Sequence, residues 1–434
     1  MVISNGKVKM SRFREAVEAA RKLIRIPSVE SAPSTLAPFG KDNREALDTA
    51  LEIASKIGFN TFCGEGYYGY AEVGDSEKPL FGILGHLDVV PVTDGWKYPP
   101  FEGRIAEGCL WGRGAEDDKA PMMAAMFAVR ELLDEGLEPK KRVRLIFGCN
   151  EESGWRCIEE YLKKEELPEW GFSPDADFPV IYAEKAVSHL RLKVPLPEGL
   201  KSFSAGTRVN IVPDHAECVT EADFSYSRLP DGISALNAGF EAFGRSAHGS
   251  TPREGDNAAC KLIAFLSESL PSLKRFRAFE ATDGSMLGLK TDDEIYGALT
   301  LNAGVFETVG DSLFVSVDFR HPAKITTESI IERLKEFFGG EVEVRGSHRP
   351  LYVPKEHPLV KALSEAYALV TGDNAEPVSV GGATYARAIP VAVAFGPVFP
   401  GEHSNIHQTD ERISLENFEK MMKIYKYAIK KLCF

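Results

Sequence analysis

Two strand-length apolar runs constrain the fold of this chain more than any other feature of its sequence. Residues 80–84 are apolar on both faces, and residues 142–148 become apolar after two arginines. Continuous apolar runs of this length are typical of strands that are covered on both faces. A strongly helical run, residues 120–133, lies between them. This alternation predicts an α/β fold with a mainly parallel sheet, whose ligands bind at the carboxyl ends of strands.

The first part of the chain contributes further elements of the same kind. Apolar positions three and four apart predict a helix over residues 10–26. A second helix follows, with Asp42 as its expected N-cap and Gly58 as its end. Residues 67–73 then form a predicted strand. The methionines of the 120–133 run are interpreted as core packing.

The pattern changes near residue 187 and returns near residue 352. Between these points, runs such as HLRLKV and LFVSVDFR alternate polar and apolar residues, which predicts an antiparallel sheet with one solvated face. Two helices, residues 258–270 and 327–338, interrupt these strands. We therefore predict a discontinuous catalytic α/β domain of residues 1–186 and 352–434. Residues 187–351 form an inserted α+β lid domain with an antiparallel sheet.

Composition excludes several classes of function. The net charge is −13, and no cluster of lysines and arginines is longer than the one at residues 140–144, so a nucleic-acid partner is not expected. No apolar run approaches the roughly 18 residues that span a bilayer, and the N-terminus lacks an apolar signal region. The seven cysteines are scattered without a CxxC pair. These features predict a cytoplasmic protein with no membrane partner and mostly buried thiols.

One motif favours a different class, a dinucleotide-dependent oxidoreductase. Residues 64–69 match GxGxxG. The match runs from a predicted helix into a predicted strand, whereas a dinucleotide site needs a strand, a tight turn and then a helix. The sequence context therefore argues against this function.

Residues with ligand chemistry gather where predicted strands end. His86 and Asp88 are two apart at a strand end, so both side chains point to the same side. One can bind a metal while the other steadies it. Asp117 and Asp118 follow a turn with two glycines, which permits tight backbone geometry.

Further carboxylates and a second histidine complete a ligand set. Glu151 and Glu152 follow the run 142–148, and Asp175 and His407 lie in later loops. Two imidazoles with three carboxylates suit zinc, manganese or cobalt better than calcium or magnesium.

The motifs GHLDVVP, GRGAEDDKAP, NEESGW, SPDADFP and HQTDERI, in this order, resemble metallopeptidase family M20 and, within it, the dipeptidase V branch. The resemblance covers most of the chain. It implies two divalent metal ions, with zinc expected and manganese or cobalt as alternatives. His86 and Asp175 would bind one ion, Glu152 and His407 the other, and Asp117 would bridge both.

The resemblance also implies roles for other residues. Asp88 would orient His86, and Glu151 would be the general base for a metal-bridging water that attacks the peptide bond. His248, in the motif GRSAHG of the lid, would stabilise the oxyanion. The substrate carboxylate would be held by Asn210, Arg320 and the backbone at Gly382.

Two departures from the family pattern bear on these expectations. Ala120 follows Lys119 where the family usually has glycine, a change that we expect to be tolerated. The lid is longer than that of dimeric members, yet residues 219–240 are shorter than in the monomeric branch. The oligomeric state therefore stays open between monomer and homodimer.

We therefore predict a dinuclear metal-dependent dipeptidase that hydrolyses short unblocked peptides. An N-acyl amino acid deacylase of the same family is the alternative, because it would keep the same metals and base. A metal-free binding protein with the same fold would have lost ligands, and all five are present.

Overall fold

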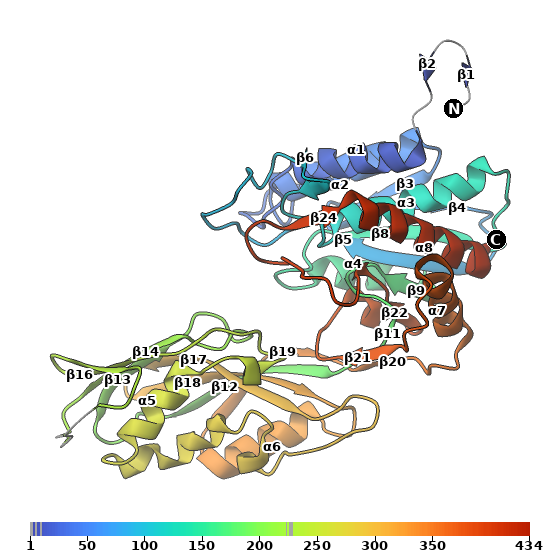
Figure 1. Ribbon diagram of the computed structural model, residues 1–434. Coiled ribbons are helices and arrows are strands. Elements are labelled where there is room, and N and C mark those ends of the chain that lie inside the picture. Colours follow the sequence, from blue (N-terminus) through green and yellow to red (C-terminus); the bar gives the residue numbers. More distant parts are fainter. Residues whose placement is uncertain (1–2, 5–6, 9–10, 223, 225–228) are drawn as a thin grey trace. The chain divides into compact units, whose positions relative to one another are not determined.

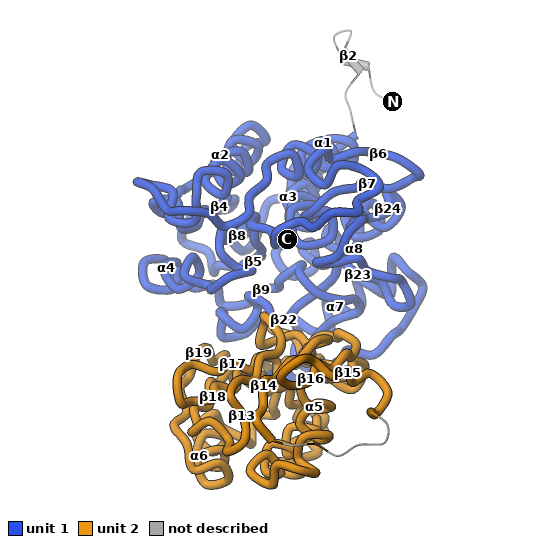
Figure 2. Tube along the Cα trace, turned by 90° about the vertical axis from the view of Figure 1, so that its left-hand side faces the viewer, with its two compact units in different colours: residues 1–182, 352–378, 384–434 blue, residues 183–351, 379–383 orange. Residues whose placement is uncertain are grey.

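The computed structural model describes residues 3–4, 7–8, 11–222, 224 and 229–434, and the chain divides into two compact units (Figures 1 and 2). The first unit comprises Met1–Tyr182, Tyr352–Val378 and Thr384–Phe434, and the second Ala183–Leu351 and Ser379–Ala383. The short segment 379–383 belongs to the second unit because its carbonyls accept hydrogen bonds there, from Lys185 N to Val380 O (3.1 Å) and from Arg320 Nη1 to Gly381 O (3.1 Å).

Four parallel strands form the centre of the sheet in the first unit, in the order β22, β9, β5, β8. All seven residues of β5 and all seven of β8 are buried, as their apolar patterns predict. The predicted parallel α/β sheet is therefore confirmed. The four strands are β5 (Leu80–His86), β8 (Arg142–Gly148), β9 (Trp170–Ser173) and β22 (Ala392–Ala394).

Antiparallel strands flank this centre. On one side β4 (Tyr68–Val73) pairs with β8, and β3 (Asn60–Gly64) pairs with β4 as a hairpin. On the other side β11 (Ile181–Glu184) pairs antiparallel with β22. The GxGxxG match is the turn of the β3–β4 hairpin. The predicted helix is present as α2 (Lys41–Lys56), but β3 lies between it and the match; the turn leads into a strand as expected.

Helices cover both faces of the sheet (Figure 1). Helix α3 packs against β5, α1 and α8, while α2 and α4 pack against β4. Met122, Met123 and Met126 of α3 are buried, so their interpretation as core residues is confirmed. The helices are α1 (Arg12–Ile24), α2 (Lys41–Lys56), α3 (Lys119–Asp134), α4 (Arg156–Lys164), α7 (Pro358–Thr371) and α8 (Leu415–Cys433).

Some predicted helix ends differ from the structure. The predicted start at Met10 lies outside the described residues, and α1 is capped by Ser11, whose hydroxyl accepts from Arg14 N. Asp42 is not the N-cap of α2. The chain enters that helix at Gly40 with a φ of 101°, a value that favours glycine, and Asp42 lies in the first turn. There its charge is favourable to the helix dipole.

Three short strands lie beside this domain's main sheet. They form a small sheet in which β7 (Cys109–Trp111) pairs with both β6 (Arg104–Ala106) and β24 (Arg412–Ser414). Two further pairs are β1 (Ile3–Ser4) with β2 (Lys7–Val8) and β10 (Ala176–Asp177) with β23 (Pro397–Val398). The short strands β20 (Leu351–Tyr352) and β21 (Val378–Val380) lie at the boundaries between the units.

The second unit contains an antiparallel sheet in the order β15, β16, β14, β13, β17, β18, β12, β19. Helices α5 (Ala258–Leu266) and α6 (Thr327–Phe338) share one apolar core with the strands, so the alternating runs bury one face as predicted. The strands are β12 (Ala186–Pro195), β13 (Leu200–Ala205), β14 (His215–Thr220), β15 (Ile233–Leu236), β16 (Gly239–Phe243), β17 (Thr300–Val309), β18 (Ser312–His321) and β19 (Glu341–His348). Residues 223 and 225–228, within the stretch expected to be short, lie outside the described residues.

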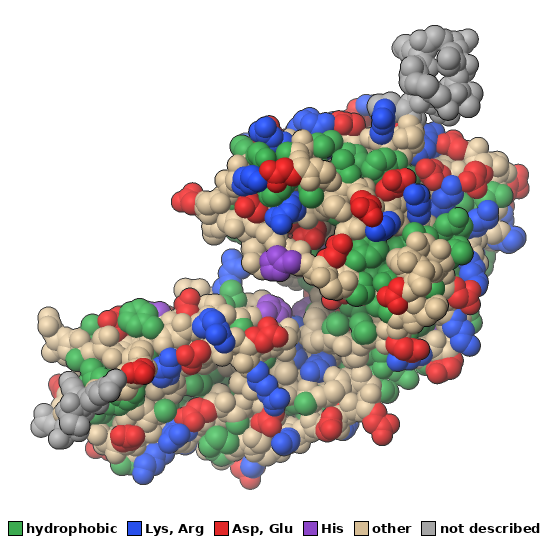
Figure 3. All heavy atoms as spheres, in the orientation of Figure 1, with side chains coloured by type: hydrophobic (Ala, Val, Ile, Leu, Met, Phe, Trp, Pro, Cys, Tyr) green, Lys and Arg blue, Asp and Glu red, His purple; other side chains and the backbone are tan. Residues whose placement is uncertain are grey.

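The surface view shows basic and acidic side chains interspersed over each unit on the face that it presents (Figure 3). Among the described residues, no helix combines the length and the apolar character needed to cross a bilayer.

Candidate functional site

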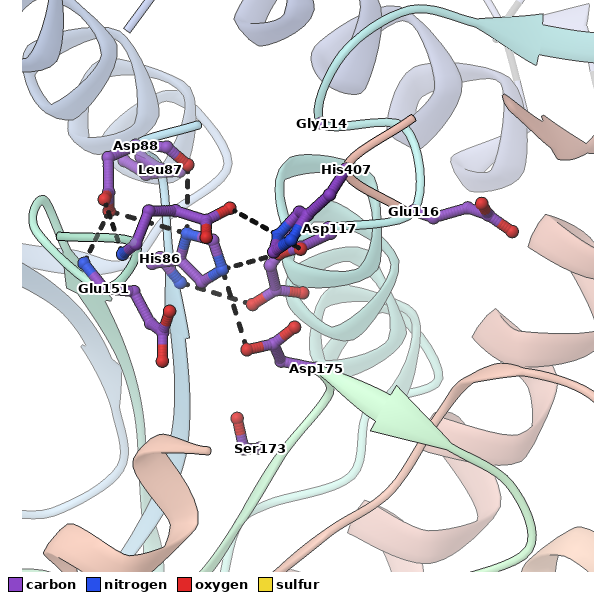
Figure 4. A network of polar contacts seen from close by, with 12 residues as sticks. His86, Leu87, Asp88, Gly114, Glu116, Asp117, Glu151, Ser173, Asp175 and His407 are labelled. Atoms are coloured by element: carbon purple, nitrogen blue, oxygen red, sulfur yellow. Dashed lines mark hydrogen bonds and ion pairs between the residues drawn. The ribbon is translucent and has the colours of Figure 1, made fainter. Parts of the chain in front are cut away.

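Three neighbouring parallel strands deliver polar side chains to one edge of the sheet. His86 is the last residue of β5 and lies in register with Gly148, the last residue of β8. Asp175 follows the end of β9 by two residues. The first unit therefore brings together the strand-end residues that the sequence singled out (Figure 4).

Asp117 lies between two imidazoles, with one carboxylate oxygen facing each. Its Oδ1 is 2.7 Å from His86 Nε2, and its Oδ2 is 2.9 Å from His407 Nε2. Asp175 Oδ2 is 3.6 Å from His86 Nε2, and Glu152 Oε1 is 3.0 Å from His407 Nε2. The five predicted ligands therefore form two groups of donors that share Asp117.

This arrangement fits a metal ion better than hydrogen bonding alone. His86 Nδ1 faces the backbone oxygen of Asp88 at 3.0 Å, which leaves Nε2 directed at carboxylates. His86 Nε2 and Asp117 Oδ1 face each other at 2.7 Å, yet both are buried and neither meets the geometry of a hydrogen bond. Ligand atoms of His86, Asp117 and Glu152 lie within 4.8 Å of one another. A cation between these atoms would satisfy all of them.

The electrostatics of the cluster agree with this interpretation. Burial opposes protonation of His86, but the carboxylates of Asp117, Asp175 and Asp88 outweigh it and raise the pKa of the imidazole well above its usual value. The pKa of Asp117 is lowered, because the two imidazoles outweigh the effect of burial. The negative potential that draws protons to the imidazoles would equally attract a divalent cation.

Asp88 supports the site in a way that its sequence position did not reveal. Its carboxylate is 1% exposed and accepts hydrogen bonds from the backbone N–H groups of Glu151 (Oδ1, 3.0 Å) and Glu152 (Oδ2, 3.0 Å). Its Oδ1 also lies 3.5 Å from His86 Nδ1. The buried carboxylate thus holds the turn that carries both glutamates, while the backbone oxygen of the same residue faces His86 Nδ1 at 3.0 Å.

A glycine at the end of β5 allows a second support. Asp118 Oδ2 accepts a hydrogen bond from His86 N at 3.2 Å. A Cβ atom at Gly85 would lie 2.0 Å from that oxygen. Glycine at position 85 therefore permits Asp118 to approach the strand end that carries His86.

Glu151 lies in an aromatic surrounding. Trp155 Nε1 donates to Glu151 Oε1 at 3.0 Å, and the ring of Tyr385 packs edge-on against Trp155. Tyr385 also lies edge-on to the His86 ring, with centroids 6.3 Å apart. Burial raises the pKa of Glu151 well above its usual value, against the opposing effect of His86. A carboxyl with a raised pKa suits acid–base chemistry near neutral pH.

The sequence reasoning missed three residues that support this site: Tyr385, Glu116 and Glu411. Tyr385 is fully buried and its hydroxyl lies 2.7 Å from Cys157 Sγ. Nothing in the local pattern separates these residues from ordinary core or loop positions. The available signals were closeness in sequence to a predicted ligand: the motif HQTDERI contains Glu411 after His407, and the motif GRGAEDDKAP contains Glu116 beside Asp117.

The remaining predicted residues lie in the second unit, where the structure gathers them. Gly249, next to His248, donates its N–H to Asn210 O at 2.7 Å, and Ile211 forms a bridge with His248. The exposed His248 has its Nδ1 2.6 Å from Ser250 Oγ. A Cβ atom at Gly249 would lie 2.6 Å from Asp318 Oδ2.

Arg320 joins this group through Asp318. Its Nε and Nη2 donate to the Asp318 carboxylate at 2.9 and 3.0 Å, and its Nη1 donates to Gly381 O, beside Gly382. Asp318 is fully buried, and the pKa of its carboxyl is lowered because Arg320 and His189 outweigh the effect of burial. Asp318 therefore fixes the plane of the guanidinium.

Comparison with known proteins gives consistent results. The model of peptidase family M20/M25/M40 matches residues 82–431. A protein of Bacillus subtilis (strain 168) named "Putative dipeptidase YtjP" is 37% identical over 466 residues, which cover 99% of each chain. A Staphylococcus aureus (strain USA300) protein, "Putative dipeptidase SAUSA300_1697", is 34% identical over 98% of this chain and 99% of its own length.

Solved structures share the fold. Human carnosine dipeptidase 1 has a TM-score of 0.63 at 14% identity, covering 97% of this chain and 96% of its own. An M20 family metallo-carboxypeptidase from Sulfolobus solfataricus, Sso-CP2, has a TM-score of 0.62 at 21% identity, covering 96% of this chain and 98% of its own. Together with the family match, these findings show that the chain belongs to peptidase family M20/M25/M40 and is a metallopeptidase, a metal-dependent hydrolase.

Proposed function

We propose that this chain is a dinuclear metal-dependent dipeptidase that hydrolyses short unblocked peptides. The observation that carries the proposal is Asp117, which offers one oxygen to each of two imidazoles, with His86 Nε2 and Asp117 Oδ1 buried 2.7 Å apart and neither satisfied by a hydrogen bond. The names of the relatives at 37% and 34% identity support a dipeptide substrate.

His86 and Asp175 would hold one ion, Glu152 and His407 the other, and Asp117 both. Zinc is the expected ion, because imidazole and carboxylate ligands suit it. When bound, such ions lower the pKa of water and polarise carbonyl groups.

Glu151 would act as the general base. Its carboxylate would take the proton of the attacking water and return it to the leaving amine. The Trp155 N–H and the backbone bond to Asp88 would hold it in position. In the second unit, which we propose acts as a lid, His248 would stabilise the oxyanion, and Asn210, Arg320 and the backbone at Gly382 would hold the substrate carboxylate.

The test is Glu151→Ala. Turnover of dipeptides should fall by several orders of magnitude while metal content stays near that of the wild type, because Glu151 is not one of the proposed ligands. Retained turnover, or loss of both ions, would show that the base is misassigned.

The alternative function, an N-acyl amino acid deacylase, differs from a dipeptidase in its substrate. Rates with a panel of dipeptides and with N-acetyl and N-succinyl amino acids would decide between them. Faster hydrolysis of the acylated compounds would overturn the dipeptidase proposal while leaving the metal centre in place.

A further inference from the structure

Two loops of the first unit supply ligands that face each other. The Asp117 loop (residues 112–118) follows β7, and the His407 loop (residues 402–411) precedes β24. We propose that Glu411 and Glu116 are positioning residues that lock these two loops together. This inference rests on the proposed function, because the ligand pair that it concerns is part of the proposed metal centre.

The two loops leave neighbouring strands. Arg412 of β24 pairs with Trp111 of β7. The pairing continues one residue further, because Gly112 N donates to Glu411 O at 3.0 Å. Glu411 therefore lies at the base of the Asp117 loop although the two are almost 300 positions apart in the sequence.

The carboxylate of Glu411 is enclosed by the Asp117 loop. Its Oε1 accepts from the backbone N–H groups of Gly114 (2.9 Å), Glu116 (2.9 Å) and Asp117 (3.3 Å). Its Oε2 accepts from Arg113 Nη1 at 2.6 Å, and Glu411 is fully buried. Backbone N–H groups that converge in this way form an anion-binding nest, whose shape depends on the anion that it holds.

Glu116 makes the reciprocal contact. Its side chain points away from the ligand cluster (Figure 4) and is 8% exposed. Its Oε2 accepts from Asn405 N at 3.1 Å and from Ser404 Oγ at 3.3 Å, both in the His407 loop. Each loop therefore offers one carboxylate to the backbone of the other.

His407 needs such support more than His86 does. The side chain of His86 is 1% exposed, so close packing holds it, whereas that of His407 is 50% exposed. The backbone of His407 also has a φ of 62°, which is unfavourable for residues other than glycine and persists only where the surroundings impose it. Apart from the contacts of its ring with Asp117 and Glu152, the orientation of His407 therefore depends on the conformation of its loop.

Glu411→Gln tests the inference with little change in size. The amide keeps one acceptor oxygen, so it can satisfy either Arg113 or the three N–H groups, and its NH₂ group faces donors on the other side. We expect the affinity for zinc at the weaker site to fall about 10–100-fold, as is typical when a group that orients a ligand is lost. Glu116→Gln should have a smaller effect in the same direction, because its amide oxygen can still accept from Asn405 N.

The experiment uses the full chain, stripped of metal and titrated with zinc against a chromophoric chelator. Thermal unfolding of the metal-free proteins is measured in parallel. Glu72→Gln is the matched control, since Glu72 binds Arg144 (2.6 Å) in the sheet, outside both loops. This control should lose stability but keep its affinity for zinc.

A double-mutant cycle with His407→Ala separates positioning from general destabilisation. If Glu411 acts through the ligand pair, its loss should weaken zinc binding less in the His407→Ala background than in the wild type. Wild-type affinity in Glu411→Gln, or an equal loss of affinity in Glu72→Gln, would overturn the inference. If Glu411→Gln does not fold, an unchanged affinity for zinc in Glu116→Gln would overturn the inference. A wild-type chain that binds no divalent cation would instead refute the proposed function.

Discussion

Replacing Asp88 by asparagine should uncouple the glutamate turn from the strand end that carries His86. The carboxylate of Asp88 is 1% exposed and accepts one backbone N–H on each oxygen, from Glu151 and Glu152. Asparagine keeps one acceptor and turns an NH₂ group toward the other N–H. One charge-assisted hydrogen bond worth about 1.5–3 kcal/mol is lost, and a buried donor is left without a partner.

The expected result is a loss of activity as well as a loss of stability. A shift of about 1 Å in the turn that carries Glu151 and Glu152 costs on the order of 10²-fold in rate. We expect kcat/KM for a dipeptide to fall by about that factor at saturating zinc. Steady-state kinetics, zinc titration and thermal unfolding measure the three effects separately.

Asp177→Asn is the control, since that residue is exposed and lies two positions after Asp175. It should leave both rate and affinity near those of the wild type. The reasoning is refuted if Asp88→Asn folds, binds zinc normally and keeps kcat/KM within about threefold of the wild type.

Two further predictions concern other parts of the chain. Asp318→Asn should raise KM for dipeptides more than it lowers kcat, because it frees the Arg320 guanidinium that Asp318 holds by two nitrogens; steady-state kinetics with an unchanged KM would contradict this. The hydrogen bond from Arg12 lowers the pKa of Asp134 to about 2, against the effect of burial. The pair therefore stabilises the folded chain at pH values above 3.8, the ordinary pKa of the carboxyl, and this contribution disappears as the pH falls toward 2. Asp134→Asn should therefore cost about 0.5–1 kcal/mol near pH 6 and almost nothing near pH 2, as measured by denaturant unfolding; an equal cost at both pH values would contradict it.

The fold followed largely from local patterns. The apolar composition of runs 80–84 and 142–148 predicts that both are buried, and the structure places both in the parallel centre of the sheet. The alternating runs between residues 187 and 351 likewise gave the antiparallel sheet. Local patterns were weaker at element ends. Asp42 has the chemistry of an N-cap, but the helix begins earlier because Gly40 can adopt a backbone conformation that other residues rarely adopt.

The candidate ligands were also predictable, for a physical reason. Parallel strands end at the same edge of a sheet, so His86 and the residues after β8 and β9 must converge there. Their roles as metal ligands and base stay a proposal, as does the role of the second unit as a lid.

The supports of these residues depend on tertiary structure alone. The sequence by itself singled out the groups that we propose carry the chemistry, because that choice depends on residue type and on position relative to a strand end. It could not determine that the Asp88 carboxylate binds the backbone of Glu151 and Glu152, or that the loop before Asp117 encloses the carboxylate of Glu411. Those bonds join segments that are distant in sequence and use backbone N–H groups, which every residue except proline has, so they leave no pattern in the chain.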